Sequence, residues 1–295
     1  MSSSSRWFSP YLLLLGLILA AGIILVSCGP SLKQPAAQAS AYDRAKDAFK
    51  SGQLDKALEL TGKLARATPP GDYTERARVL RAVIFTGELK AEGSLAEAYG
   101  KGSEKSKNSQ FQAKYRRLHN DNLATAEKAA LNLAETAHQL APDGKMAKEL
   151  TLEASYPATE GPSDIKQFAH VEEGGWIEPD EQENAATDAL RKGIDDALAD
   201  VVSGDRAKAR TALAGGSLKL EGAPFAIFLA KELSDGAVLF DRHHGRDPQK
   251  LITLCDEGDA IVKAALALLQ DAPDKDQMAE AKKLQEKFKT IRKDK

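Results

Sequence analysis

Apolar side chains recur every three or four residues over long stretches of this chain, the spacing that places them on one face of an α-helix. The clearest example lies within residues 111–140, where leucine and alanine form a single stripe: Leu123, Ala126, Ala130, Leu133, Ala137 and Leu140. Aromatic residues make up only 6% of the chain, so the aromatic and β-branched runs that build strands are scarce,. We therefore expect an all-α fold.

The stripe within residues 111–140 needs a partner, because its alanines leave room for a second helix to approach closely. That helix belongs either to the same chain, in an antiparallel pair, or to a second copy in a coiled-coil dimer. The stripe covers fewer than three heptads, which favours the pairing within one chain.

The N-terminal segment combines one basic residue, Arg6, with an apolar run over residues 11–26, a pattern typical of a secretory signal,. The run ends in Leu-Val-Ser-Cys at positions 25–28 and resembles the lipobox of bacterial lipoproteins. The resemblance implies that residues 1–27 are a cleaved lipoprotein signal peptide and that Cys28 is lipidated. An uncut transmembrane anchor and an ordinary cleaved signal are the alternatives, although the run falls short of the roughly 20 apolar residues of a span.

Lipid on Cys28 implies a protein held at the bacterial cell envelope, with the membrane as its first partner. Position 29 is glycine rather than the aspartate that retains lipoproteins in the inner membrane of enterobacteria-like systems. The resemblance therefore implies the periplasmic face of the outer membrane. Residues 28–40 are rich in proline and small side chains and are expected to form a mobile tether,.

The net charge and the cysteine content further limit the kinds of protein that this chain can be. The formal net charge is −2, which provides no strong field to attract nucleic acid,. The chain has two cysteines, and if Cys28 carries lipid, Cys255 has no partner within the chain. The apolar helical pattern around Cys255 predicts a buried, unreactive thiol.

Residues 41–69 resemble a tetratricopeptide repeat (TPR), a pair of antiparallel helices joined by a tight turn. The resemblance is carried by a glycine in the turn, by small and apolar residues in the second helix and by a terminating proline: Gly52, Leu54, Ala57, Leu64 and Pro69. The glycine-to-alanine spacing recurs in residues 93–98, after an apolar helical segment over 77–89, and in residues 204–209, after 186–202, so the resemblance implies similar turns there. The resemblance implies an irregular helical-hairpin (TPR-like) solenoid with one good repeat and several eroded ones.

Residues 156–184 interrupt the helical pattern with prolines, glycine pairs and acidic side chains. A break of this length often marks a domain junction. We therefore expect an N-terminal TPR-like helical domain over 41–155, an irregular acidic linker over 156–184 and a C-terminal helical domain over 185–295. The periodicity of the last part predicts helices near 186–202, 207–213, 223–240, 248–269 and 276–291.

Motifs for nucleophilic catalysis, phosphate binding or metal coordination are missing from the sequence, so we expect no enzymatic activity and no cofactor,. The densest polar cluster is residues 241–247, where His243 and His244 lie among carboxylates and two arginines. Histidine and aspartate suit zinc, but the arginines would repel a cation. A solvated loop with Asp247 as a helix N-cap is the favoured interpretation.

Two further segments have both a functional and a structural interpretation. Residues 101–117 are basic and contain Phe111 and Tyr115, which suits either contact with anionic lipid or an acidic partner, or an ordinary solvated helix face,. Trp176 follows two glycines, so it either anchors a partner or covers a groove of its own domain,.

These observations favour a non-catalytic scaffold or adaptor lipoprotein that binds a protein partner of the cell envelope. Its concave surface is expected along the first helices of the hairpins, residues 41–50 and 77–89. The candidate contact residues are Arg44, Lys46, Arg78 and Arg81, which are expected to be exposed, and Trp176. The alternative is a ligand- or metal-binding lipoprotein that uses the His243/His244 loop or the Trp176 loop. The sequence indicates neither a small-molecule substrate nor a nucleic-acid partner.

Overall fold

A computed structural model describes residues 35–67, 70–202, 204–242 and 247–293. This part of the chain confirms the all-α expectation, because two four-residue strands, β1 (Glu149–Leu152) and β2 (Leu218–Glu221), are its only β-structure. The α-helices are α2 (Pro35–Lys50), α3 (Leu54–Ala65), α4 (Asp72–Lys105), α5 (Ser109–Leu140), α6 (Lys166–Glu172), α7 (Pro179–Val201), α8 (Arg206–Leu213), α9 (Gly222–Arg242), α10 (Pro248–Asp271) and α11 (Lys275–Lys293). A short 3-10 turn, Pro142–Gly144, follows α5.

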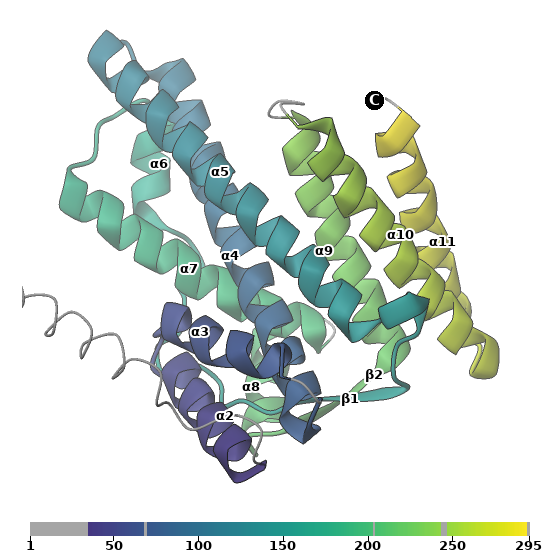
Figure 1. The fold of residues 1–295 in the computed structure, drawn as a ribbon. Helices are drawn as coiled ribbons and strands as arrows, with labels where there is room; N and C mark the ends of the chain where they lie inside the picture. Colours follow the sequence, from purple (N-terminus) through teal and green to yellow (C-terminus); the bar gives the residue numbers. More distant parts are fainter. Residues whose placement is uncertain (1–34, 68–69, 203, 243–246, 294–295) are drawn as a thin grey trace, which may run out of the picture.

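The antiparallel pair of α4 and α5 forms the middle of the molecule, with 34 and 32 residues (Figure 1). All six residues of the predicted leucine–alanine stripe on α5 are buried, and α5 packs against α4, α9 and α10. The pairing within one chain is therefore confirmed. Figure 1 shows α9, α10 and α11 side by side on one flank of this pair, with α6 and α7 on the other.

The three copies of the glycine-to-alanine pattern have different structures. Gly52 joins α2 to α3 with φ +76°, and Gly204 lies between α7 and α8 with φ +94°, so both glycines occupy turns that favour a residue without Cβ,. The copy at Gly93 was predicted to be a similar turn, and this is wrong, because Gly93 lies inside α4. Strong helix formers flank it, and α4 is buried both before and after it, so continuing the helix outweighs the roughly 1 kcal/mol cost of one glycine,.

The predicted start of the helical part also needs correction. The tether was expected to reach residue 40, but α2 begins at Pro35, and Gln38 is already buried. Several residues named in the sequence predictions lie outside the described residues: Cys28 with the rest of residues 1–34, Pro69, His243 and His244.

The segment 156–184 does not divide the hydrophobic core. It contains α6 and the start of α7, and it buries Ile165, Val171 and Ile177. One continuous core cluster contains residues from both sides of it, from Ala48 to Ile291. The antiparallel pairing of β1 with β2 also joins the two sides, with Leu150 opposite Leu220.

The C-terminal helices agree with the predicted ranges within a few residues, except that α7 begins at Pro179 rather than near 186. Proline is favourable in the first turn of a helix, and the Glu181 side chain accepts a hydrogen bond from the Glu178 N–H in a capping box,. Cys255 is fully buried, and burial raises the pKa of its thiol to about 11, as expected for an unreactive cysteine,.

Half-buried Glu92 on α4 makes stability depend on pH. Burial raises the pKa of its carboxyl to about 7, whereas an unfolded glutamate titrates near about 4.3. Between these values the folded state binds more protons, so stability falls as pH rises through this window. We expect Glu92→Gln to raise the free energy of unfolding by about 1 kcal/mol above about pH 7, and to have little effect near about pH 4, in urea titrations.

The matched control is Glu104→Gln on the same helix, because Glu104 is exposed. It should leave the unfolding midpoint unchanged at both pH values. A gain from Glu92→Gln that is equal at both pH values would show that the carboxyl charge is not its cause.

Candidate functional site

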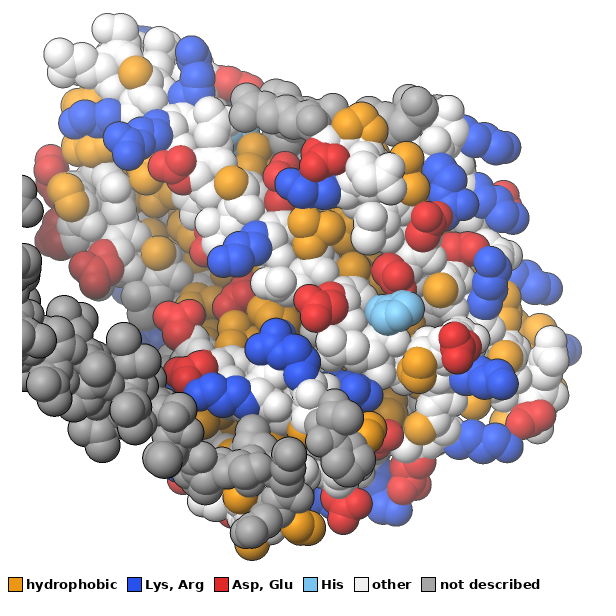
Figure 2. Space-filling view, viewed as in Figure 1, with side chains coloured by type: hydrophobic (Ala, Val, Ile, Leu, Met, Phe, Trp, Pro, Cys, Tyr) orange, Lys and Arg blue, Asp and Glu red, His pale blue; other side chains and the backbone are white. Residues whose placement is uncertain are grey.

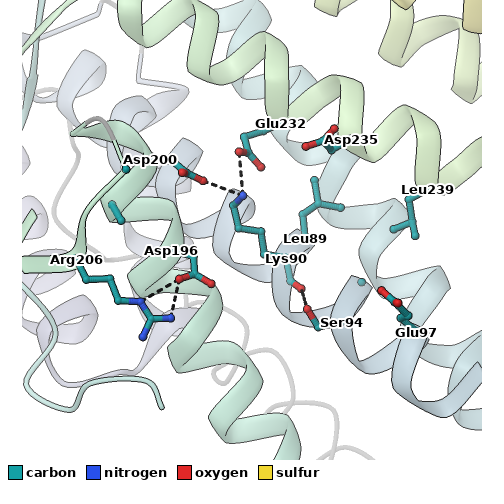
Figure 3. A pocket seen from close by; sticks show the side chains of 13 residues that line it. Leu89, Lys90, Ser94, Glu97, Asp196, Asp200, Arg206, Glu232, Asp235 and Leu239 are labelled. Carbon is teal, nitrogen blue, oxygen red and sulfur yellow. Dashed lines mark hydrogen bonds and ion pairs between the residues drawn. The ribbon is translucent and has the colours of Figure 1, made fainter. Parts of the chain in front are cut away.

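A large open cleft lies between α4, α7 and α9 and has a volume of about 720 Å³ (Figure 3). We call it the α4–α7–α9 cleft. Its labelled lining residues come from all three helices and from the start of α8: Leu89, Lys90, Ser94, Glu97, Asp196, Asp200, Arg206, Glu232, Asp235 and Leu239. Most of these side chains are charged, so the cleft is suited to a polar or charged molecule.

The contact between α4 and α7 sets one wall of the cleft. These helices meet at Gly87 and Gly193, where the Gly193 backbone lies directly against the Gly87 carbonyl and the Ile194 side chain packs on Gly87. A Cβ atom on Gly193 would overlap the Gly87 carbonyl oxygen and lie 3.1 Å from the Ala91 nitrogen. This close approach places Lys90 of α4 opposite Asp200 of α7.

Lys90 holds the base of the cleft together. Its Nζ lies 3.0 Å from an Asp200 carboxylate oxygen and 3.0 Å from Glu232 Oε1 (Figure 3). The Glu232 side chain is only 1% exposed. Burial raises the pKa of the Glu232 carboxyl, and the charge on Lys90 opposes this shift. Burial lowers the pKa of Lys90, but Glu232 and Asp200 raise it by more, so the net change is a rise. A buried carboxylate needs such a partner.

A second ion-pair group fixes the α7–α8 side of the cleft. Arg206 Nε and Nη2 lie 3.0 and 2.6 Å from Asp196 Oδ1, and Lys192 Nζ lies 2.7 Å from Asp196 Oδ2. Burial raises the pKa of the Asp196 carboxyl, but Lys192 and Arg206 lower it by more, so its pKa lies below the usual value. Arg206 also donates to the Gly161 and Pro162 carbonyls, so it holds the loop before α6 against α8.

The outer part of the cleft is more exposed. Glu97 and Asp235 lie there, with side chains 68% and 53% exposed. Glu97 pairs with Lys101 at 2.9 Å, and Asp235 pairs with Lys287 at 3.1 Å. Exposed ion pairs contribute less than about 1 kcal/mol, so these carboxylates can exchange partners with an incoming molecule at little cost. The arrangement is suited to binding a charged segment on a rigid base.

A second polar surface lies at the free end of the α4–α5 pair, where Lys and Arg side chains gather (Figures 1 and 2). We call it the basic tip and define it by Lys105, Lys107, Lys114 and Arg116, all exposed. Half-buried Trp176 stacks on Phe111 there, with centroids 5.2 Å apart and planes at 19°. Lys114 Nζ lies 4.4 Å from the Trp176 ring centroid.

The predicted contact residues do not form one surface. Arg44 is exposed on α2, but Lys46 pairs with Glu153 at 2.6 Å and with Asp43 at 3.0 Å. Trp176 belongs to the basic tip, at the opposite end of α4 from α2 and α3 (Figure 1).

Arg78 and Arg81 donate to backbone carbonyls of other helices and are half-buried, contrary to their expected exposure. Arg78 bonds the Ala65 and Gln139 carbonyls, near the C-terminal ends of α3 and α5, where helix carbonyls lack partners,. These two guanidinium groups therefore serve packing within the fold.

The key residues of the cleft, Lys90, Glu232 and Arg206, were not predicted from the sequence. Lys90 and Glu232 are 142 positions apart, and only the packing of α4 against α9 brings them together. The sequence did contain a signal for Glu232, because a carboxylate within the apolar segment 225–240 is expected to be buried and to need a partner,. Arg206 lies in residues 204–209, where the glycine-to-alanine spacing indicated a turn and gave the arginine no role.

Comparison with known proteins adds no relative: no family model, curated protein or solved structure matches the chain. Within the described residues, no helix has both the length and the apolar character needed to cross a bilayer. The same part of the chain contains no group of three or more His, Cys, Asp and Glu side chains that could hold a metal ion.

Proposed function

We propose that this protein is a lipid-anchored, non-catalytic adaptor of the bacterial cell envelope that binds a protein partner in the α4–α7–α9 cleft. The observation that carries the proposal is the cleft itself, which is large, open and charged and is framed by three packed helices. An extended or helical segment with basic side chains fits it, because such a segment can pair with Glu97 and Asp235,.

The anchoring part of the proposal is supported by the Leu-Val-Ser-Cys ending of the N-terminal apolar run. Acylation of Cys28 would hold the helical body at the periplasmic face of the outer membrane. The TPR-like part is supported by the α2–α3 hairpin, with its turn at Gly52 and its buried Ala57 and Leu64. We propose that this hairpin is a degenerate repeat attached to an irregular helical body.

The anchor is tested by replacing Cys28 with serine in the full chain. We expect loss of signal cleavage and loss of the acyl mass in the purified protein. Wild-type processing and unchanged fractionation of Cys28→Ser would contradict lipid anchoring, whatever the result for the cleft.

The cleft is tested in intact envelopes with a photo-crosslinking amino acid at exposed Ser94, inside the cleft, and at exposed Thr253 on α10. We expect a discrete protein adduct from position 94 only. Reversing the outer charges with Glu97→Lys and Asp235→Lys should reduce this adduct at least tenfold, about 1.4 kcal/mol of binding free energy, because a basic partner segment would then be repelled.

The matched control is Glu59→Lys with Asp256→Lys on α3 and α10. Glu59 pairs with Lys63 four positions on, as Glu97 does with Lys101, and exposed Asp256 pairs with Arg292, as Asp235 does with Lys287. The control should leave the adduct unchanged. Equal adducts from positions 94 and 253, or equal losses from both reversals, would show that the cleft is not the binding site.

A further inference from the structure

We propose that the basic tip docks on an anionic phospholipid surface, as a second membrane contact besides the N-terminal segment. The four cations Lys105, Lys107, Lys114 and Arg116 form no ion pair with another described residue. Residues 101–117 carry six cations and a single acid, Glu104. The adjoining α6–α7 segment contributes Glu172, which pairs with Lys101, and the exposed Glu173, Glu178 and Glu181. The positive charge is therefore concentrated on the α4–α5 end itself, in a chain whose net charge is −2.

The turn between α4 and α5, which follows Lys105 and contains Lys107, is held rigidly. Ser106 is buried, and its N–H bonds the Gly102 carbonyl at 3.0 Å. Gly174, with φ +85°, packs directly on it, and a Cβ there would lie 2.6 Å from the Ser106 nitrogen. Asn108 accepts a hydrogen bond from the Gln110 N–H and thereby caps α5,. The lysines on either side of the turn are thus presented without the ordering cost of a loop.

The aromatic side chains of the tip suit a bilayer interface. The Phe111–Trp176 stack is half-buried, so one side of it packs on the fold while the other reaches solvent beside Lys114. The Tyr115 hydroxyl donates to the Gly175 carbonyl and fixes the Trp176 loop from below. Tryptophan beside lysine is the combination found where proteins meet lipid headgroups.

The shape of the tip favours lipid over an acidic protein. It is the projecting end of two long helices (Figures 1 and 2), and specific protein partners are instead anchored in buried central pockets. Each basic residue near an anionic leaflet contributes about fivefold in affinity, so the four cations together add several hundredfold to a chain held by one other anchor.

Trp176 provides a direct test, because the only other tryptophan is Trp7. We would reconstitute the full chain carrying Trp7→Phe into two kinds of vesicle, both with brominated acyl chains. One kind contains phosphatidylcholine alone, and the other contains phosphatidylcholine mixed with phosphatidylglycerol. Flotation establishes that each variant is in the vesicles. Docking is expected to quench Trp176 fluorescence in the mixed vesicles, and high salt should abolish the quenching.

Lys105→Gln, Lys107→Gln and Arg116→Gln together should lower the docked-to-free ratio about a hundredfold. The matched control removes three exposed, unpaired lysines elsewhere, with Lys208→Gln, Lys282→Gln and Lys283→Gln, and should quench like the parent. Equal quenching in the tip variant and the control, or none in the mixed vesicles, would overturn the proposal. Both results are independent of whether Cys28 is acylated and of the partner cross-links.

Discussion

Gly193→Ala is expected to lower the free energy of unfolding by about 3 kcal/mol, the upper part of the range for overpacked cores. The new Cβ would overlap the Gly87 carbonyl oxygen and lie 3.1 Å from the Ala91 nitrogen. Both obstacles are backbone atoms in the middle of α4, so no side chain can rotate away to make room. Helices α4 and α7 would have to separate. Urea denaturation followed by far-UV circular dichroism measures the loss.

Gly93→Ala is the matched control in the same pair of helices and has the opposite expected sign. Apart from its own helix backbone and chain neighbours, the described residues place one atom within 4 Å of the new Cβ, Leu239 Cδ2 at 3.8 Å, which is ordinary van der Waals contact. Because Gly93 lies inside α4, alanine should stabilise the helix by up to about 1 kcal/mol,. A neutral Gly193→Ala would disprove the close crossing, and a destabilising Gly93→Ala would indicate a turn at Gly93.

The contrast between Gly52 and Gly93 shows how much of the fold could be predicted from the sequence. Periodicity depends on local spacing, so it identified the helices, and the stripe on α5 is buried as expected. Whether a glycine ends a helix depends on what packs around it. Gly52 occupies a turn, and a Cβ added to it would meet no described residue within 4 Å beyond its chain neighbours, whereas the helix around Gly93 is buried on both sides. The pattern is the same, but the tertiary environment differs.

The candidate site was less predictable, because ion pairs in an all-α fold depend on which helix faces meet. Lys46, Arg78 and Arg81 looked like solvent-exposed cations, yet each bonds a carboxylate or carbonyl of another element. Lys90 was not distinguished from other lysines, although it is the residue that holds Glu232. A charged residue within an apolar helix signals a buried partner, but it does not identify that partner.

Lys90→Met is expected to cost about 3–4 kcal/mol of unfolding free energy near about pH 8, because it leaves the Glu232 carboxylate buried without its cation. Methionine keeps the length and apolar stem of lysine, so the loss reports the charge. The control Lys101→Met removes a lysine that also bridges two carboxylates, Glu97 and Glu172, but whose side chain is 46% exposed. It should cost less than about 1 kcal/mol.

The pH dependence separates a lost charge from lost packing. Burial already raises the pKa of Glu232 and the Lys90 charge opposes that shift, so Lys90→Met should raise this pKa further. Between the unfolded value of about 4.3 and the raised folded value, the folded state binds more protons, so stability falls as pH rises. The deficit of Lys90→Met should therefore be smallest near about pH 4 and grow toward about pH 8. Adding Glu232→Gln should recover most of the loss at the higher pH, because it removes the unpaired charge. A deficit that is independent of pH and unrelieved by Glu232→Gln would mean that Lys90 acts through packing alone.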